Sequence, residues 1–310
     1  MNANLSSKVT EISFIVPVYN EEKSISDTLH HLHKALLDLD ISFEIIVVND
    51  GSMDSTSEII ERVGFELKII NHPLNIGYGN AIKTGIKSAK YMWIGIVDAD
   101  GTYKINELEV LVKEAEKGFD MVIASRFDIS KTDSFIRKIL RFIFNNIIKV
   151  FVNQKIIDPN SGFRIFKKDI ILALFPLLCG TFSFTTSSTI LVMGSDKFVS
   201  FVPLSLSQRV GRSRTNNFRD SFLALLTIIQ GITFFNPIKF FIIYSLFFVV
   251  FFCVPSMILA LYSMHTLSLY YMIFGATVSI LIGLGILSDV IRISILKLNF
   301  EKMIEDNNLR

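Results

Sequence analysis

Short apolar runs alternate with amphipathic segments along much of the chain. The apolar runs are rich in Ile and Val, as buried strands are, and lie at residues 12–18, 43–48, 67–70, 94–97 and 121–124. Helical spacing of apolar residues follows at residues 24–39, 81–88 and 105–117, and residues 54–56 open a further helix. Strands that alternate with helices in this way predict an α/β fold with a parallel sheet.

Polar clusters directly follow three of these predicted strands, at residues 19–22, 49–54 and 98–102. In a parallel sheet the carboxyl ends of the strands meet at one edge, and ligands bind outside that edge. We therefore expect the three clusters to converge on one site.

An acidic pair stands out in the third cluster. Asp98 and Asp100 follow the strand at 94–97, and Gly101 comes next. Two such carboxylates can share one hard cation, Mg²⁺ or Mn²⁺, which usually takes its other ligands from water and phosphates. The pattern predicts a cation and diphosphate site. A solvated turn is the alternative, because Asp and Gly are ordinary turn residues.

A glycine loop at residues 75–80 (NIGYGN) precedes one predicted helix. It does not match a dinucleotide fingerprint, because Ile82 stands where the third glycine would be and the loop does not follow the first strand. A helix-opening turn and a direct phosphate contact are both compatible with it.

Less regular patterns follow. Residues 135–152 repeat apolar positions at helical spacing and carry Arg and Lys, which is typical of an amphipathic helix at an anionic membrane surface or of a core helix with a solvated basic face. Residues 181–203 predict mixed short strands around a turn at 194–196.

Two long apolar spans end the chain, at about 234–262 and 267–288. Each exceeds the roughly 20 residues that a membrane helix needs. Arg and Lys flank the outer ends, at residues 209–219, 239, 292 and 297, and the loop at 263–266 has neither. The positive-inside rule predicts a hairpin with both ends in the cytoplasm. Core helices of a soluble protein are the alternative.

Four regions are expected from these patterns. They are a cytoplasmic domain at 1–220, an interfacial helix at 221–233, a transmembrane hairpin at 234–292 and a cytoplasmic tail at 293–310. The N-terminus has no apolar segment typical of a signal peptide. The net charge is only +2, so no nucleic-acid partner is expected, and the 2 cysteines form no disulfide framework or zinc motif.

Five motifs occur in a fixed order: PVYNEE at 17–22, NDGSMDST at 49–56, DADG at 98–101, SRF at 125–127 and SGFR at 161–164. The set resembles family 2 glycosyltransferases. More narrowly, it is similar to the polyprenyl-phosphate glycosyltransferases, of which dolichyl-phosphate mannose synthase is one member. The likeness runs from about residue 11 to 220, and the two-span tail suits the bacterial and archaeal members.

The resemblance implies a GT-A fold, Rossmann-like, that binds a UDP- or GDP-sugar with Mg²⁺ or Mn²⁺. Positions matching the nucleotide-sugar site are Pro17, Tyr19, Glu21, Asp50, Asp98, Ala99, Asp100 and Arg126. Positions matching the acceptor-phosphate site are Arg164, Arg209 and Arg214. Asp98 and Asp100 match the metal-binding acids, and Asp158 matches an acid near the reacting centre, so these three are the catalytic candidates.

Three departures from the family pattern bear on the identity of the donor. Asn49 stands where many members have a first aspartate, Thr102 where the mannose synthases have a glutamine metal ligand, and Arg214 where a lysine is usual. The QxxRW motif of processive synthases is absent after residue 160, which argues against polymer synthesis.

The resemblance therefore implies a multi-pass enzyme of the cytoplasmic membrane. It would transfer a sugar with inversion to undecaprenyl or dolichyl phosphate, with its catalytic domain on the cytoplasmic side. Two alternatives are transfer to a lipid or glycan hydroxyl, and a non-catalytic membrane scaffold that binds nucleotide sugars. A homo-oligomer is compatible with this organisation.

Overall fold

The computed structural model describes residues 8–126, 156–181, 183–204, 229 and 237–308. The chain divides into two compact units, Met1–Thr227 and Ile228–Arg310, and each is described by itself. The predicted amphipathic helix at 135–152 lies outside the described residues, as does the predicted interfacial helix at 221–233 apart from residue 229.

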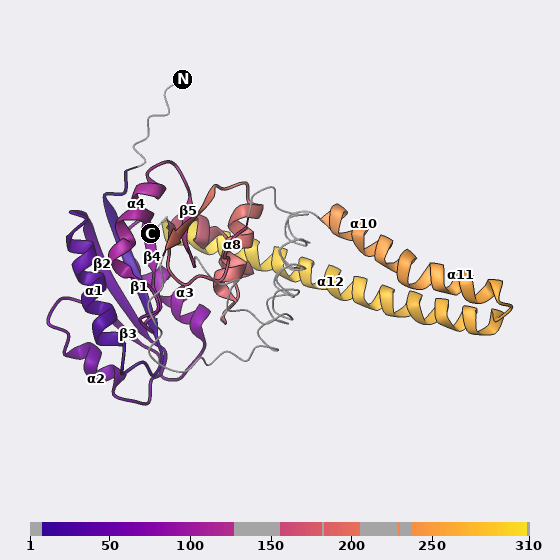
Figure 1. Ribbon diagram of the computed structural model, residues 1–310, viewed down its shortest axis with the longest axis horizontal. Coiled ribbons are helices and arrows are strands. Elements are labelled where there is room, and N and C mark those ends of the chain that lie inside the picture. Colours follow the sequence, from indigo (N-terminus) through magenta and orange to yellow (C-terminus); the bar gives the residue numbers. More distant parts are fainter. Residues whose placement is uncertain (1–7, 127–155, 182, 205–228, 230–236, 309–310) are drawn as a thin grey trace, which may run out of the picture. The chain divides into compact units, whose positions relative to one another are not determined.

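A seven-stranded mixed sheet forms the centre of the first unit (Figure 1). Its strands are β1 (Glu11–Val18), β2 (Ser42–Asn49), β3 (Lys68–Asn71), β4 (Trp93–Ile96), β5 (Met121–Arg126), β6 (Arg164–Lys167) and β7 (Val199–Leu204), in the order β3-β2-β1-β4-β6-β5-β7. β6 runs antiparallel between β4 and β5, whereas the other pairs are parallel. The α/β class was predicted correctly, and the predicted parallel pairing is present between β1, β2, β3 and β4; the antiparallel β6 was not predicted. β6 is short and begins with a charged residue, so its apolar pattern was not visible.

Helices cover both faces of this sheet. They are α1 (Ile25–Leu37), α2 (Thr56–Glu61), α3 (Tyr78–Ser88), η1 (Ile105–Glu107), α4 (Leu108–Ala115), α7 (Lys168–Ala173), η2 (Phe175–Leu177) and α8 (Phe184–Gly194). Successive residues of β1 point to opposite faces. Phe14 lies in the buried cluster that includes α1 and α4, whereas Ile15 packs against Gly85 of α3, so α1 and α3 lie on opposite sides of the sheet (Figure 1).

The helix α8 corrects the prediction of short strands at 181–203. Its Thr, Ile and Val residues have a high strand propensity. However, the hydroxyls of Ser187, Ser188 and Thr189 donate back to carbonyls one turn earlier in the same helix. The whole helix is buried almost to its end, so tertiary packing overrides local propensity. Only β7, at the end of the segment, is a strand.

Two long apolar helical segments form the second unit (Figure 1). The first comprises α10 (Pro237–Phe248), a π-helical turn (Val249–Cys253) and α11 (Val254–Leu261), and the second is α12 (His265–Asn308). Phe240–Leu261 and His265–Arg292 are long and apolar enough to cross a membrane, by length and composition. Only 6% of the most apolar window of each is buried in the structure, which is unlike the core helices of a soluble protein.

Polar contacts join the two helical segments along their length. The hydroxyls of Ser256 and Ser268 each donate to the other residue's carbonyl, at 3.1 and 2.8 Å. Pro255 lacks the N–H that would bond the carbonyl of Phe251 in a regular α-helix. The hydroxyl of Tyr271 donates to that carbonyl instead, at 2.9 Å. The hairpin therefore satisfies its own irregular backbone, as an apolar environment requires.

Candidate functional site

The first two polar clusters of the sequence form one interlocked surface. The backbone N–H of Asn20 donates to the hydroxyl of Ser52 at 3.0 Å, and the Asn20 side-chain oxygen accepts from the Met53 amide at 2.6 Å. The Glu21 amide donates to the hydroxyl of Thr56 at 2.9 Å. Asn20 has a φ of 52°, a left-handed conformation that Asn tolerates. The loops after β1 and β2 are thus bonded to each other at the carboxyl ends of these two strands.

Asp50 fastens the glycine loop to this surface. Its carboxylate, 2% exposed, accepts hydrogen bonds from the backbone N–H groups of Ile76 at 3.1 Å and Gly77 at 2.9 Å. It also lies 2.7 Å from Nδ1 of His72. Its carboxylate is thus bonded to the loop that precedes α3, and the contact with a nucleotide that the sequence suggested stays a prediction.

The carboxylate of Asp98, after the end of β4, has two close neighbours. The hydroxyl of Tyr78, the first residue of α3, donates to Asp98 Oδ1 at 2.7 Å. Gly162 is the second neighbour, and any Cβ there would overlap the carboxylate. Burial, followed by the charge of Asp98, raises the pKa of Tyr78 well above 10. Tyr78 therefore remains a hydrogen-bond donor throughout the physiological pH range.

The rest of the acidic loop is fixed by contacts of its backbone. The hydroxyl of Thr28 on α1 donates to the carbonyl of Ala99 at 3.3 Å. Asp100 Oδ1 accepts from the Thr102 amide at 3.0 Å, and Gly101 between them has a φ of 70°. The Thr102 hydroxyl is a buried side-chain oxygen without a hydrogen-bond partner in the described part of the chain.

Tyr103 joins the acidic loop to the segment before β6. Its hydroxyl oxygen accepts from the Gly162 amide at 2.8 Å and from the Ser161 hydroxyl at 3.2 Å. Asp158, 4% exposed, belongs to the same segment. The structure therefore brings the SGFR motif beside the DADG motif, as their shared assignment to one site requires.

Arg164 is completely buried and does not face a ligand site. Its guanidinium donates to the carbonyls of Pro159, Ser161 and Thr185 and to the hydroxyls of Ser188 and Thr189. Every guanidinium N–H group thus has a partner within the protein. The acceptor-phosphate contact suggested by the resemblance stays a prediction, and this geometry favours a structural role instead.

Burial lowers the pKa of Arg164 to about 10. Neighbouring ionisable groups oppose this shift, and they are Tyr78, Tyr103, Asp158 and Asp98. The guanidinium consequently stays charged near neutral pH, and its charge acts on Asp158 and Asp98.

Other predicted site residues are placed as follows. Pro17 is buried in β1, where it pairs with Val48 of β2, and Tyr19 and Glu21 are partly exposed in the following loop. Arg126 ends β5, but its side chain is outside the described residues, as are Arg209 and Arg214.

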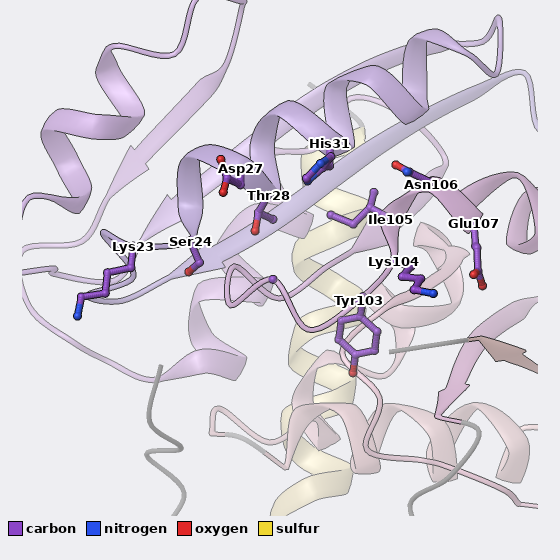
Figure 2. A pocket seen from close by; sticks show the side chains of 11 residues that line it. Lys23, Ser24, Asp27, Thr28, His31, Tyr103, Lys104, Ile105, Asn106 and Glu107 are labelled. Carbon is purple, nitrogen blue, oxygen red and sulfur yellow. The ribbon is translucent and has the colours of Figure 1, made fainter. Parts of the chain in front are cut away.

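A cavity of about 540 Å³ lies beside the acidic loop, between the first turns of α1 and residues 101–107 (Figure 2). Lys23, Asp27, His31 and Lys104 are among its lining residues, and Gly101 is the member of the DADG motif that reaches it. Neither Asp98 nor Asp100 lines it. The cavity therefore borders the candidate site without containing its acids.

Sequence reasoning missed the two tyrosines, Tyr78 and Tyr103. Tyr78 sits in the glycine loop, which was interpreted as a helix-opening turn or a phosphate contact, with no role for the tyrosine side chain. A signal was nevertheless present, because a tyrosine at the start of a helix beside a parallel sheet can reach the end of a neighbouring strand.

Comparison with known proteins places the chain in a family. The model of the family described as Glycosyl transferase family 2 matches residues 13–175. Dolichyl-phosphate beta-glucosyltransferase ALG5C of Trichomonas vaginalis is 33% identical over 181 residues, which cover 53% of this chain and 54% of that protein. Undecaprenyl-phosphate 4-deoxy-4-formamido-L-arabinose transferase of Proteus mirabilis is 30% identical over 189 residues, which cover 57% of each. The chain spans about half the length of these curated relatives.

The fold has counterparts among solved structures. Glucosyl-3-phosphoglycerate synthase from Mycobacterium tuberculosis, crystallised with Mn²⁺, UDP-glucose and phosphoglyceric acid, superposes with a TM-score of 0.58 at 16% identity. The match covers 72% of this chain and 80% of that one. At this identity the likeness concerns the fold alone, and it confirms the predicted GT-A architecture. With more than half of its residues matched by the family model, the chain belongs to glycosyl transferase family 2.

Proposed function

We propose that this protein is a membrane-bound, inverting glycosyltransferase that moves a sugar from a UDP- or GDP-sugar to undecaprenyl or dolichyl phosphate. The observation that carries the proposal is the acid pair Asp98 and Asp100 at the carboxyl end of β4, with the Asp98 carboxylate confined between Tyr78 and Gly162. The two relatives above are a dolichyl-phosphate and an undecaprenyl-phosphate sugar transferase, which supports this class of acceptor.

A divalent cation fits the residues at this edge. Asp98 and Asp100 would hold Mg²⁺ or Mn²⁺ through hard oxygen ligands, and the buried Thr102 hydroxyl lacks a partner among the described residues beside them. Water and the donor's phosphates would supply the remaining oxygen ligands, as is usual for such a cation. When bound, the cation would neutralise charge that develops on the leaving diphosphate.

The donor nucleotide would lie on the interlocked loops after β1 and β2. Pro17, Tyr19, Glu21 and Asp50 are proposed as its surroundings, with Arg126 near the phosphates. The hydrogen bonds between the loops hold this surface in one conformation before the donor arrives. Binding on a preorganised surface loses less conformational entropy than binding on a mobile one.

The acceptor chemistry needs little help from a base. A phosphate monoester already carries about −1.5 to −2 charges at neutral pH, so its oxygen can attack the anomeric carbon directly. Asp158 is buried close to the charged Arg164, which suits a carboxylate that orients a reactant. Arg209 and Arg214 are proposed to hold the acceptor phosphate. A single in-line displacement inverts the configuration at the anomeric carbon.

The hairpin accounts for access to a lipid substrate. The two apolar segments, Phe240–Leu261 and His265–Arg292, would anchor the enzyme in the bilayer where polyprenyl phosphates reside. We propose that the catalytic domain at 1–220 and the tail at 293–310 lie on the cytoplasmic side, in keeping with the basic residues at both ends of the hairpin.

The test is a transfer assay with the full-length protein in lipid nanodiscs. Radiolabelled UDP- and GDP-sugars are supplied with Mn²⁺ and undecaprenyl phosphate, and the lipid-linked product is separated and counted. The matched control acceptor is undecaprenol, which keeps the lipid and lacks the phosphate. Lipid-linked product that forms with undecaprenyl phosphate and not with undecaprenol supports the proposal. Equal product with undecaprenol would assign the enzyme to hydroxyl acceptors, and nucleotide-sugar binding without any product would indicate a scaffold.

A further inference from the structure

Three backbone amides of the glycine loop are bonded within the protein. The N–H groups of Ile76 and Gly77 donate to Asp50, and the N–H of Asn80 donates to the carbonyl of Gly180 at 3.0 Å. Gly77 has a φ of 104°, and a Cβ there would lie 2.9 Å from the same Gly180 carbonyl oxygen. The loop is therefore packed tightly between Asp50 and Gly180, and these contacts fix its backbone.

The fixed loop delivers one side chain to the acidic pair. Tyr78 directly follows Gly77, and its hydroxyl reaches Asp98 Oδ1 at 2.7 Å. Because Asp50 anchors the two residues before Tyr78, the position of this hydroxyl depends on β2 rather than on the flexibility of the loop. A series of hydrogen bonds thus connects the ends of β2 and β4, from Asp50 through the glycine loop to Tyr78 and Asp98.

Gly162 is a second close neighbour of the Asp98 carboxylate. It lies against the carboxylate without room for a Cβ, and the Gly162 amide donates to the Tyr103 hydroxyl at 2.8 Å. Arg164 in turn donates to the carbonyl of Ser161, which precedes Gly162. One backbone segment and one hydroxyl thereby restrict the position of the carboxylate.

We propose that Tyr78 is a positioning residue that orients the Asp98 carboxylate for a divalent cation. The inference rests on the proposed function, since it takes Asp98 as a ligand of that cation. A partner that bonds a ligating side chain fixes its rotamer, and removing such a partner typically weakens metal affinity about 10- to 100-fold. The Tyr78 hydroxyl donates to Oδ1, and it therefore acts on the carboxylate group itself.

The test measures cation binding, which needs neither acceptor nor turnover. Full-length protein in detergent is titrated with Mn²⁺ in the presence of UDP, and free Mn²⁺ is followed by electron paramagnetic resonance. The variant is Tyr78→Phe, which keeps the ring and removes the hydroxyl. Tyr91→Phe is the matched control, because the Tyr91 hydroxyl accepts from Lys90 Nζ, 3.5 Å away, and lies outside the acidic site.

We expect Tyr78→Phe to raise the Kd for Mn²⁺ at least about 10-fold and Tyr91→Phe to leave it unchanged. In an Asp98→Asn background the same Tyr78→Phe change should have no further effect, since the two residues act through one bond. Saturating Mn²⁺ should restore the turnover of Tyr78→Phe, which a merely structural defect would not allow.

Three results would overturn the inference. The first is an unchanged Kd for Mn²⁺ in Tyr78→Phe. The second is an equal loss of affinity from Tyr78→Phe in the Asp98→Asn background, which would show that Tyr78 acts elsewhere. The third is wild-type protein that binds no Mn²⁺ in the presence of UDP. Failure of the proposed function looks different, because then Mn²⁺ binds in a Tyr78-dependent way but no sugar reaches a polyprenyl phosphate.

Discussion

The backbone of Gly162 lies directly against the carboxylate of Asp98, with no space between them for a side-chain carbon. Gly162 belongs to the SGFR motif and Asp98 to the DADG motif, so the contact joins two motifs that are far apart in the chain. Its backbone φ does not require glycine, because Gly162 is absent from the positive-φ glycines of the described chain. The glycine is needed because of the close approach.

Gly162→Ala should therefore displace the Asp98 carboxylate. We expect sugar transfer to fall at least about 10-fold, as when a partner of a metal ligand is lost. Gly64→Ala is the matched control, because nothing lies within 4 Å of a Cβ at that position. Initial rates of the two variants under identical donor and Mn²⁺ concentrations decide the matter. A Gly162→Ala enzyme as active as Gly64→Ala would mean that Asp98 tolerates the shift.

Arg164→Lys distinguishes a structural from a ligand-binding role. Lysine cannot replace all the hydrogen bonds of the guanidinium, so buried carbonyls before β6 lose their partners. Hydrogen bonds to charged groups contribute about 1.5–3 kcal/mol each. For a unit of this size, a loss of about 3 kcal/mol lowers Tm by roughly 6–12 °C. Differential scanning fluorimetry measures the shift. An unchanged Tm with a raised KM for the polyprenyl phosphate would instead show that Arg164 binds the acceptor.

Asp50→Asn tests the anchor of the glycine loop. The amide keeps one acceptor oxygen but loses the charge that strengthens the bonds to Ile76 and Gly77. We expect a lower Tm and, through Tyr78, weaker Mn²⁺ binding. The Kd for UDP measured without metal serves as the second readout. If Asp50 only contacted the nucleotide, the Kd for UDP would rise while Tm and the conformation of the glycine loop stayed unchanged.

Tyr271→Phe probes the membrane hairpin. Its hydroxyl serves the Phe251 carbonyl that Pro255 leaves without a regular partner. Interhelical hydrogen bonds in membranes contribute about 0.6 kcal/mol on average and up to about 1.7 kcal/mol, and we expect a loss in this range. The free energies of unfolding of the wild type, Tyr271→Phe, Pro255→Ala and the double variant form a double-mutant cycle. The effect of Tyr271→Phe should shrink in the Pro255→Ala background, where a backbone N–H becomes available. Equal losses in both backgrounds would contradict this explanation.

The sequence was informative where local pattern and tertiary role agree. The strands β1 to β5 were predicted because apolar runs mark buried strands, and the acidic loop because it interrupts such a run. By contrast, α8 was predicted as strands because its Thr, Ile and Val residues have a high strand propensity. Its Ser and Thr hydroxyls donate to carbonyls within the helix, and propensity does not reveal these bonds. β6 was missed because its first residue, Arg164, looks like a surface residue in sequence and is fully buried in the fold.

The candidate site shows the same division. The motif residues were identified from their types and spacing, but their partners were not, because Tyr78 and Gly162 meet Asp98 only after α3 has packed on β1 and β2 and β6 has paired with β4. Which groups orient a carboxylate is a property of tertiary contacts. Residue type and spacing indicate that acids are present at a strand end, and the fold determines where their oxygens point.

The most direct test of the account is metal-dependent transfer by the Asp98→Asn variant. Asparagine keeps the size of the side chain and removes its charge, and Asp38→Asn, an exposed change at the end of α1, is the control. Radiolabelled sugar on undecaprenyl phosphate is measured for both variants after chelation and after Mn²⁺ is restored. The account predicts that chelation stops the wild type and Asp38→Asn, that Mn²⁺ restores both, and that Asp98→Asn stays inactive throughout. Transfer that persists in the chelator, or in Asp98→Asn at the wild-type rate, would contradict it.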